Sequence, residues 1–276
     1  MVFSFISFIM ITDYGACKLC GNKRLNLVLQ TNDYQILECN KCKIAFTNPP
    51  PVIPDYENMD FHSGENKEKA EKLTYIQDLH TDWQMLLRMQ AKMIAENFNK
   101  DAEILEIGCG EGILLDEVRK LGFNNVQGIE PSTTAATRAI KKGLNVKNAY
   151  FDEGVTDKKF NLVMMSHVYE HIEDPYAFIE KIKPILKGNG SIMLTQTNYK
   201  ALLPRFRKEK WYAWVPDQHF WHFTPAGLKK LFKKFGFNTY ALNYCTLVHP
   251  RSKLYRIARK LPFLQDQFII IAKQKL

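Results

Sequence analysis

The chain has 276 residues, of which 46% are hydrophobic and 24% are charged. This composition is that of a globular protein, and it excludes collagen-like, low-complexity and wholly disordered chains. The formal net charge of +9 is unevenly distributed, because residues 200–276 carry 16 basic and 3 acidic side chains, a net charge of +13. This basic quarter is either a solvated face or a surface that binds an acidic partner.

The first residues of the chain are mainly apolar, but no stretch approaches the roughly 20 apolar residues that a membrane-spanning helix needs. The first basic residue, Lys18, follows this apolar run, whereas a signal peptide carries its positive charge in front of its apolar region. We therefore expect a cytoplasmic protein with a peripheral tail at residues 1–12 and no membrane span. A start at Met10, with an upstream extension before it, is an alternative.

Four of the six cysteines form two matched pairs, Cys17-Lys-Leu-Cys20 and Cys39-Asn-Lys-Cys42, with 18 residues between them. A pair spaced in this way can place both thiolates on one ion, and two such turns complete a tetrahedron. We predict a structural Zn²⁺ ion bound by all four cysteines. Disulfides and a redox pair are the alternatives, but a cytoplasmic setting disfavours disulfides and redox motifs seldom come as two matched pairs.

Short strands are predicted between the cysteine pairs, at residues 25–29 and 34–39, and a proline run at 49–51 ends this module. Apolar residues with helical spacing follow from 65 to 98. The sequence thus divides into a tail (1–12), a zinc-ribbon-like module (13–55), a connecting helical segment (56–99) and a large domain (100–276).

Short apolar runs alternate with amphipathic segments through the large domain, a pattern typical of a parallel sheet with helices on both faces. We predict strands at residues 103–107, 125–129, 160–165 and 191–195, with helices at 112–121, 132–142 and 174–186. A helix at 224–235 and two strands, at 237–242 and 268–272, complete the predicted α/β fold.

The most informative segment is a strand that runs into a glycine-rich turn, Glu106-Ile-Gly108-Cys109-Gly110-Glu-Gly112. Glycines let such a turn bend tightly and lie against a ligand. The spacing differs from the Gly-x-Gly-x-x-Gly of dinucleotide folds, and neither a Walker lysine nor its Ser/Thr follows. Because acidic side chains flank the glycines, the turn favours a cationic ligand, with an ammonium and a sulfonium, over a pyrophosphate.

A second carboxylate is expected at the same edge of the sheet. The next predicted strand ends in Glu130-Pro131-Ser132, and an acid at this tip can bind both hydroxyls of a ribose. Ligands of such sheets bind at the carboxyl ends of the strands, beside the switch in strand order. The glycine turn and Glu130 should therefore converge on one ligand.

These segments resemble the class I S-adenosylmethionine-dependent methyltransferases over residues 100–276. Residues 160–175 resemble the fourth strand and following turn of that family, although Asn161 stands where many relatives have Asp. The resemblance implies a seven-stranded, mostly parallel Rossmann-like sheet with helices on both faces and a reversed last strand. It also implies that S-adenosyl-L-methionine is bound by Glu106, Gly108, Cys109, Gly110, Gly112, Glu130, Pro131, Ser132, Ser166 and His167. The segment after the third strand matches poorly, and Asp152 is a guess for the adenine contact.

Two groups of histidines are candidates for the proton abstraction that an unactivated acceptor requires. The first follows the fourth predicted strand, in Ser166-His167-Val-Tyr-Glu170-His171. His167 would emerge beside the methionine part of the cofactor. Glu170 and His171 lie on the next turn, which they either brace or serve in catalysis.

The second group lies in an aromatic insertion at residues 211–224, which is either a substrate lid or a packed aromatic loop. A zinc-bearing front module followed by this domain resembles the methyltransferases of deoxysugar and cell-surface glycan pathways. Asp217 to Phe220 match the stretch in which that family carries its proposed base, so His219 is our first candidate for the base and His167 the second. Gln218 replaces the usual Glu, and both O-methylation and C-methylation stay open.

The expected acceptor is a sugar of a nucleotide- or lipid-linked glycan precursor. Such an anionic small molecule would be a ligand for basic residues of the C-terminal quarter, namely Arg205, Arg207, Lys208 and Lys210. One alternative is an RNA-modifying methyltransferase that holds the phosphate backbone with its zinc module and basic surface. Another is a non-catalytic binding protein that keeps the fold, and the oligomeric state is left open.

Overall fold

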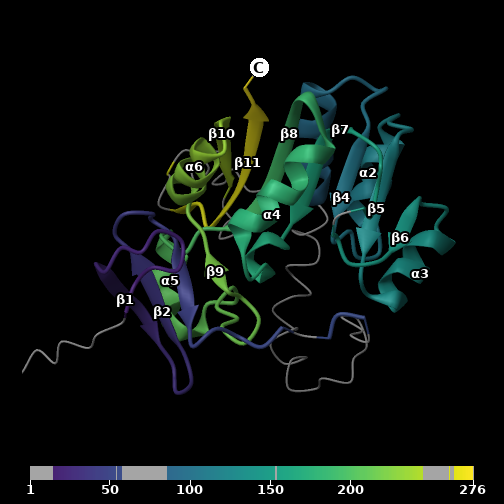
Figure 1. The fold of residues 1–276 in the computed structure, drawn as a ribbon. Coiled ribbons are helices and arrows are strands. Elements are labelled where there is room, and N and C mark those ends of the chain that lie inside the picture. The colour runs from purple at the N-terminus through teal and green to yellow at the C-terminus, as the bar shows by residue number, and fades with distance from the viewer. Residues whose placement is uncertain are drawn as a thin grey trace, which may run out of the picture.

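The computed structural model describes residues 15–53, 55–57, 86–152, 154–244, 261 and 264–275. The predicted tail and residues 58–85 of the predicted connecting segment lie outside these ranges. Within them, one sheet of four strands and one of seven form the frame of the protein (Figure 1). No helix in the described ranges is long and apolar enough to cross a membrane.

The larger sheet has the strand order β10-β11-β8-β7-β4-β5-β6. Its strands are β4 (Ile104–Ile107), β5 (Val126–Glu130), β6 (Val146–Asn148), β7 (Phe160–Ser166), β8 (Leu186–Thr197), β10 (Phe237–Tyr244) and β11 (Gln267–Gln274). Strand β11 is antiparallel to both neighbours, whereas all pairs from β8 to β6 are parallel. This topology confirms the predicted seven-stranded, mostly parallel sheet with a reversed last strand. The strand order switches between β4 and β7, where a ligand is expected.

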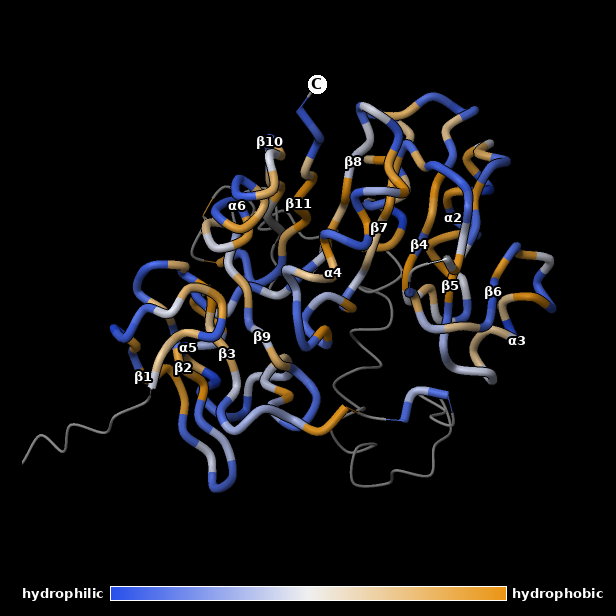
Figure 2. The backbone as a smooth tube through the Cα atoms, in the orientation of Figure 1, coloured by the Kyte–Doolittle hydropathy of each residue, from blue (hydrophilic) through white to orange (hydrophobic). Residues whose placement is uncertain are grey.

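Helices cover both faces of the larger sheet. One face carries α2 (Ile113–Lys120), α3 (Thr133–Lys141) and the helical residues 86–97, and the other carries α4 (Pro175–Ile182) and α6 (Pro225–Lys234). Along β7, Leu162 and Met164 pack with the first group, while Val163 and Met165 pack with the second. This is the period of two that a strand buried on both faces requires. The largely hydrophobic colour of β4 and β11 in Figure 2 agrees with this burial.

The ends of α4 and α6 are set by local signals. Asp174 caps α4, whose first residue is Pro175, and Thr224 caps α6 in the same way. Beyond α6, Gly236 has a φ of 82°, a left-handed conformation that ends a helix. The short helix α5 (Leu202–Arg207) has no side-chain cap, and it was not predicted from the sequence.

The smaller, antiparallel sheet has the order β1-β2-β3-β9. Its first three strands, β1 (Leu25–Gln30), β2 (Gln35–Cys39) and β3 (Ala45–Asn48), come from the zinc-ribbon-like module. The fourth, β9 (Trp221–His222), comes from the aromatic insertion and pairs with Ala45 and Phe46 (Figure 1). The module therefore shares a sheet with the large domain, and its boundary at residue 55 stays a prediction.

Side chains reinforce this junction. The hydroxyl of Thr224 donates a hydrogen bond of 2.9 Å to the carbonyl of Lys43, and Lys200 forms an ion pair with Glu38. The rings of Phe46 and Trp221 lie 6.1 Å apart in a buried core that also includes the cysteines of the module. The module is thus held by strand pairing, polar contacts and apolar packing at once.

Candidate active site

The glycine turn follows β4 at the carboxyl edge of the larger sheet. Gly108 and Gly110 have φ values of 68° and 53°, which glycine adopts without the steric penalty of other residues. A Cβ at Gly108 would lie 2.5 Å from Cγ2 of Val168, so this turn packs tightly against the turn that follows β7. A Cβ at Gly110 would meet no atom within 4 Å, so this peptide borders space that a ligand can enter.

A cavity of about 370 Å³ opens beside the glycine turn. Six of the residues predicted to bind the cofactor line it, namely Gly108, Gly110, Glu130, Pro131, Ser166 and His167. Aromatic side chains that the sequence analysis did not assign to the site also line it, and these are Tyr56, Tyr150, Phe151 and Phe178. The switch point in the strand order is therefore the position of a pocket that combines apolar walls with a few polar groups.

Glu130 is fixed at the tip of β5 by two backbone groups. Its Oε2 accepts the N–H of Gly110 at 2.8 Å, and its Oε1 accepts the N–H of Ser132 at 2.8 Å. Burial raises the pKa of Glu130, while these two hydrogen bonds act in the opposite direction. The bonds tie β5 to the glycine turn and hold the carboxylate at the wall of the cavity, where it can accept from a diol.

Glu106 lies beneath the glycine turn and is only 3% exposed. Its Oε2 is buried and has no hydrogen-bond partner. Burial and the nearby charge of Glu130 raise the pKa of Glu106 well above its usual value. A buried carboxylate oxygen without a partner is unfavourable, so a cationic ligand in the neighbouring cavity would favour the ionised form of Glu106.

Like Glu106, three other residues predicted to bind the cofactor do not line the cavity. A Cβ at Gly112 would lie 2.3 Å from Cδ1 of Leu144, so packing within the domain requires this glycine. Cys109 is buried, and its Sγ fills the space where a Cβ of Gly128 would lie. Ser132 caps α3 by accepting an N–H of the first helical turn at 3.3 Å. Each of these residues has a structural role that positions the turn or the neighbouring helix.

The segment after β6 contributes a different residue from the one that the sequence suggested. Asp152 is paired with Lys181 at 2.5 Å on the surface, whereas Phe151 and Tyr150 line the cavity. An aromatic side chain can stack on a purine. These two residues are therefore the better candidates for a contact with the adenine.

Glu170 lies at the centre of a buried polar group in the turn after β7. Its Oε1 is 3.4 Å from Nδ1 of His167, and its Oε2 accepts from the side-chain amide of Gln196 at 2.7 Å. Burial alone would raise the pKa of Glu170, but the contact with His167 and the other nearby imidazoles hold it well below its usual value. His167 has a φ of 55°, a strained conformation that is often kept at functional sites.

Two further imidazoles complete this group, and only one of them reaches the cavity. His171 lines the cavity, and its Nδ1 is 3.0 Å from the hydroxyl of Tyr56. The ring of His219 lies 4.7 Å from the ring of His171, at an angle of 84°, but it is not among the lining residues. Burial lowers the pKa of His219 to about 3, so its imidazole is neutral at physiological pH.

The aromatic insertion is mainly a packed loop. Trp211, Phe220 and Trp221 are buried in the cores between the cysteine module and the large domain. The hydroxyl of Thr47 in β3 donates to the carbonyl of His219 at 2.6 Å and lies 3.2 Å from Nε2 of His222. Of the two predicted alternatives, the packed loop therefore describes these residues better than a lid.

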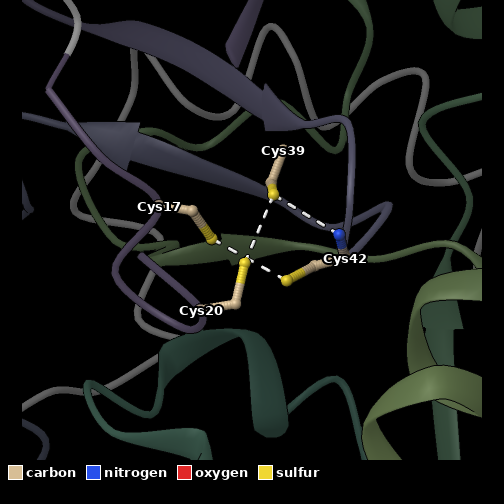
Figure 3. A group of neighbouring side chains, drawn as sticks. All are labelled: Cys17, Cys20, Cys39 and Cys42. Atoms are coloured by element: carbon tan, nitrogen blue, oxygen red, sulfur yellow. Dashed lines mark hydrogen bonds between the residues drawn. The ribbon is translucent and has the colours of Figure 1, made fainter. Parts of the chain in front are cut away.

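The four cysteines of the module converge on one point (Figure 3). All four Sγ atoms lie within 4.8 Å of one another, with 3.9 Å between Cys17 and Cys42 and 3.6 Å between Cys20 and Cys39. A tetrahedral ion with Zn–S bonds of about 2.3 Å requires S–S separations of about 3.8 Å. The backbone N–H of Cys42 and the side chain of Asn22 point at Sγ of Cys39. These donors outweigh the effect of burial and lower the pKa of the Cys39 thiol to about 7. The thiols therefore fit a zinc ion.

The basic side chains proposed to hold an anionic acceptor lie on α5 and the turn after it. Arg205, Arg207, Lys208 and Lys210 are all exposed. None of them lines the cavity beside the glycine turn. An anionic acceptor is therefore not required by the geometry of this cavity.

Comparisons with known proteins agree with this geometry. A family described as "Methyltransferase domain" matches residues 79–242, which is more than half of the chain. A ubiquinone biosynthesis O-methyltransferase of Colwellia psychrerythraea is 30% identical over 127 residues, which are 42% of this chain and 52% of the relative. The enzyme of that name from Caulobacter vibrioides is 33% identical over 130 residues, with shares of 43% and 51%. The chain thus spans about half the length of the curated relatives it matches.

Solved structures share the fold at low sequence identity. The plantazolicin methyltransferase BpumL in complex with SAH superimposes with a TM-score of 0.53 at 15% identity, over 78% of this chain and 92% of that one. The magnesium protoporphyrin IX methyltransferase ChlM of Synechocystis PCC 6803 with bound SAH gives 0.54 at 16% identity, over 72% and 86%. Both are similar to this chain in the arrangement of sheet and helices.

Proposed function

From the premise that the chain belongs to the methyltransferase-domain family and is an S-adenosylmethionine-dependent methyltransferase, we propose that it methylates a hydroxyl of a small-molecule acceptor. S-adenosylmethionine, when bound, supplies an electrophilic methyl group on a positively charged sulfur. The observation that carries the proposal is the single cavity that joins Gly110 and Glu130 to His167. A cofactor bound at this glycine turn would lie beside the imidazole of His167, which contacts the carboxylate of Glu170.

The residues present fit the cofactor. The open space at Gly110 can take the ligand against the backbone, and the fixed carboxylate of Glu130 can accept both ribose hydroxyls. Glu106, which does not itself line the cavity, would offer the ammonium its buried oxygen that lacks a hydrogen-bond partner. Phe151 and Tyr150 provide flat faces for the adenine.

His167 is the residue that we assign as the base. It lines the cavity, whereas His219 does not, and Glu170 orients its ring through Nδ1. A general base contributes a factor of about 10²–10⁴ to the rate. We therefore expect His167→Gln to lower kcat about 100-fold or more, and His222→Gln, a change at a neighbouring histidine in the insertion, to serve as the matched control. Turnover near that of the wild type in His167→Gln would remove this residue as the base.

The leading acceptor is a sugar hydroxyl of a nucleotide- or lipid-linked glycan precursor. This choice is supported by the cysteine module in front of the methyltransferase domain and by the stretch from Asp217 to Phe220 in the insertion. A second candidate is a hydroxyl of a quinone precursor, which the names of the curated relatives favour. Both candidates make O-methylation the expected reaction, and neither requires RNA.

A panel of acceptors tests the choice. The chain would be incubated with methyl-labelled S-adenosylmethionine and, separately, with nucleotide-sugars, phenolic quinone precursors and tRNA. We expect label in the nucleotide-sugars. Label in the phenols alone would replace the leading acceptor by the second candidate, and label in tRNA alone would overturn both.

A further inference from the structure

The group around Glu170 has the composition of a metal site that the methyl transfer does not by itself need. Ligand atoms of Glu170, His171 and His219 lie within 4.8 Å of one another. A carboxylate oxygen and two imidazole nitrogens are the ligands of many catalytic divalent ions, which keep an open position for substrate. Ligands of such an ion at bonds of about 2.0–2.1 Å are separated by about 3.4 Å. Side-chain rotations that close separations of up to 4.8 Å to this value are required for one ion to bind all three atoms.

Neighbouring groups already hold the atoms that would not face the ion. Gln196 donates to Oε2 of Glu170, whereas Oε1 faces the imidazoles and already lies 3.4 Å from Nδ1 of His167, so a cation would share this oxygen with His167. The hydroxyl of Tyr56 contacts Nδ1 of His171, so Nε2 would be the nitrogen that binds a cation, in place of the contact that this ring makes with the carbonyl of Gln218. Partners of this kind fix the orientation of ligands at metal sites.

The three residues come from segments that the fold brings together. Glu170 and His171 lie in the 3-10 helix η1 (Tyr169–His171) after β7, and His219 lies in the insertion. The carbonyl of Glu170 accepts the N–H of Phe220 at 2.9 Å, and Thr47 holds the carbonyl of His219. The two sides of the group are thus joined by backbone hydrogen bonds and do not depend on an ion to meet.

We propose that Glu170, His171 and His219 bind a divalent transition-metal ion, and that this ion binds the acceptor hydroxyl. The binding of the acceptor by the ion rests on the proposed function, because it requires an acceptor hydroxyl next to the cofactor. The ion lowers the pKa of the bound hydroxyl, whose proton passes to His167. The oxygen then forms a bond to the methyl carbon as the bond from carbon to sulfur breaks. The products are the methyl ether, S-adenosylhomocysteine and one proton.

Cobalt binding to the full chain tests the site without cofactor or acceptor. The chain would be stripped of metal and loaded with Co²⁺, and elemental analysis would count the bound ions. Absorption spectroscopy would distinguish the two sites, because only the cysteine site gives thiolate charge-transfer bands. We expect two Co²⁺ ions per chain in the wild type. His219→Gln and Glu170→Gln should each bind one, with the thiolate bands retained. His222→Gln, the matched control, should bind two.

Two results would overturn the site. One is a wild-type chain that binds a single Co²⁺ ion, with all of it at thiolates. The other is a His219→Gln variant with the same Co²⁺ content as the wild type. Calorimetric binding of S-adenosylmethionine by each variant, together with its thiolate bands, shows that the chain is folded. A loss of Co²⁺ from a folded variant therefore supports the proposal.

The catalytic half has its own test. With zinc kept at the cysteines, we expect turnover to fall at least tenfold when the second site is emptied and to recover when Co²⁺ is added. Equal turnover with the second site filled and empty would overturn the role of the ion in the reaction. A chain that binds two Co²⁺ ions and methylates no hydroxyl would instead overturn the proposed function and leave the metal site standing.

Discussion

Replacement of Glu106 by Gln should weaken cofactor binding while it stabilises the cofactor-free protein. The carboxylate is 3% exposed and has an oxygen without a hydrogen-bond partner. A hydrogen bond to a charged group contributes about 1.5–3 kcal/mol, and the change to Gln weakens the bond between Glu106 and the ammonium of the cofactor. At about 1.4 kcal/mol for each tenfold change, this loss corresponds to an affinity for S-adenosylmethionine about 10- to 150-fold lower.

The effect on stability has a defined dependence on pH. Because burial raises the pKa of Glu106 in the folded chain, its contribution to stability is present below the pKa of the unfolded state. That contribution is lost as the pH rises through the higher pKa of the folded state. Glu106→Gln should therefore unfold at a higher temperature than the wild type at alkaline pH, and the difference should close as the pH falls below the usual range of a glutamate.

Titration calorimetry and thermal unfolding without cofactor would measure the two effects. Glu111→Gln is the matched control, because Glu111 flanks the same glycines but pairs with Arg138 and Lys142 at 3.0 and 3.2 Å. S-adenosylhomocysteine, which has the ammonium but no sulfonium, should lose as much affinity as S-adenosylmethionine. Unchanged affinity in Glu106→Gln, or an equal loss in Glu111→Gln, would refute the assignment of Glu106 as the counter-charge of the cofactor.

Two other changes test the junction between the cysteine module and the large domain. Removal of zinc by a chelator should lower the unfolding temperature, because the four thiols share a core with Trp221 of β9. Elemental analysis before and after should show the loss of the ion. An unchanged unfolding temperature after this loss would contradict a structural role of the zinc. Thr47→Val removes the hydroxyl bound to the carbonyl of His219 and should lower the free energy of unfolding by about 1–3 kcal/mol, whereas Thr47→Ser should retain most of it. Denaturant titration measures both variants, and equal stability of Thr47→Val and the wild type would show that this bond contributes nothing.

Much of the larger sheet could be predicted from the sequence because its strands are buried on both faces. β4 and β7 are mainly apolar, with Glu106 and Asn161 as interruptions, and amphipathic helices separate them from their neighbours. β6 was not predicted, because its residues are half-buried or exposed at the edge of the sheet and form no apolar run. β9 has only two residues, and it exists because β3, far away in the sequence, pairs with it.

Site residues could be predicted from the sequence where their role depends only on the loop that carries them. Gly108, Gly110 and Glu130 line the cavity as the motif suggested. Gly112 belongs to the same motif, but packing against Leu144 determines its role. A contact between distant segments places His219 behind His171, and no local pattern reports it.

Aromatic residues of loops were missed for a related reason. Tyr56 and Phe151 line the cavity but belong to no periodic pattern. The position of Phe151, just after the third parallel strand, was the one available signal, because the carboxyl ends of these strands meet at the ligand.

Transfer of a labelled methyl group from S-adenosylmethionine to a small-molecule oxygen is the most direct test of the central claim. The wild-type chain would be assayed with the acceptor panel, and mass spectrometry with NMR would locate the methyl group on the product. We expect a methyl ether and one S-adenosylhomocysteine for each ether formed, with the rate lost in His167→Gln. A chain that binds the cofactor and places the methyl group on carbon, or only on RNA, would contradict it.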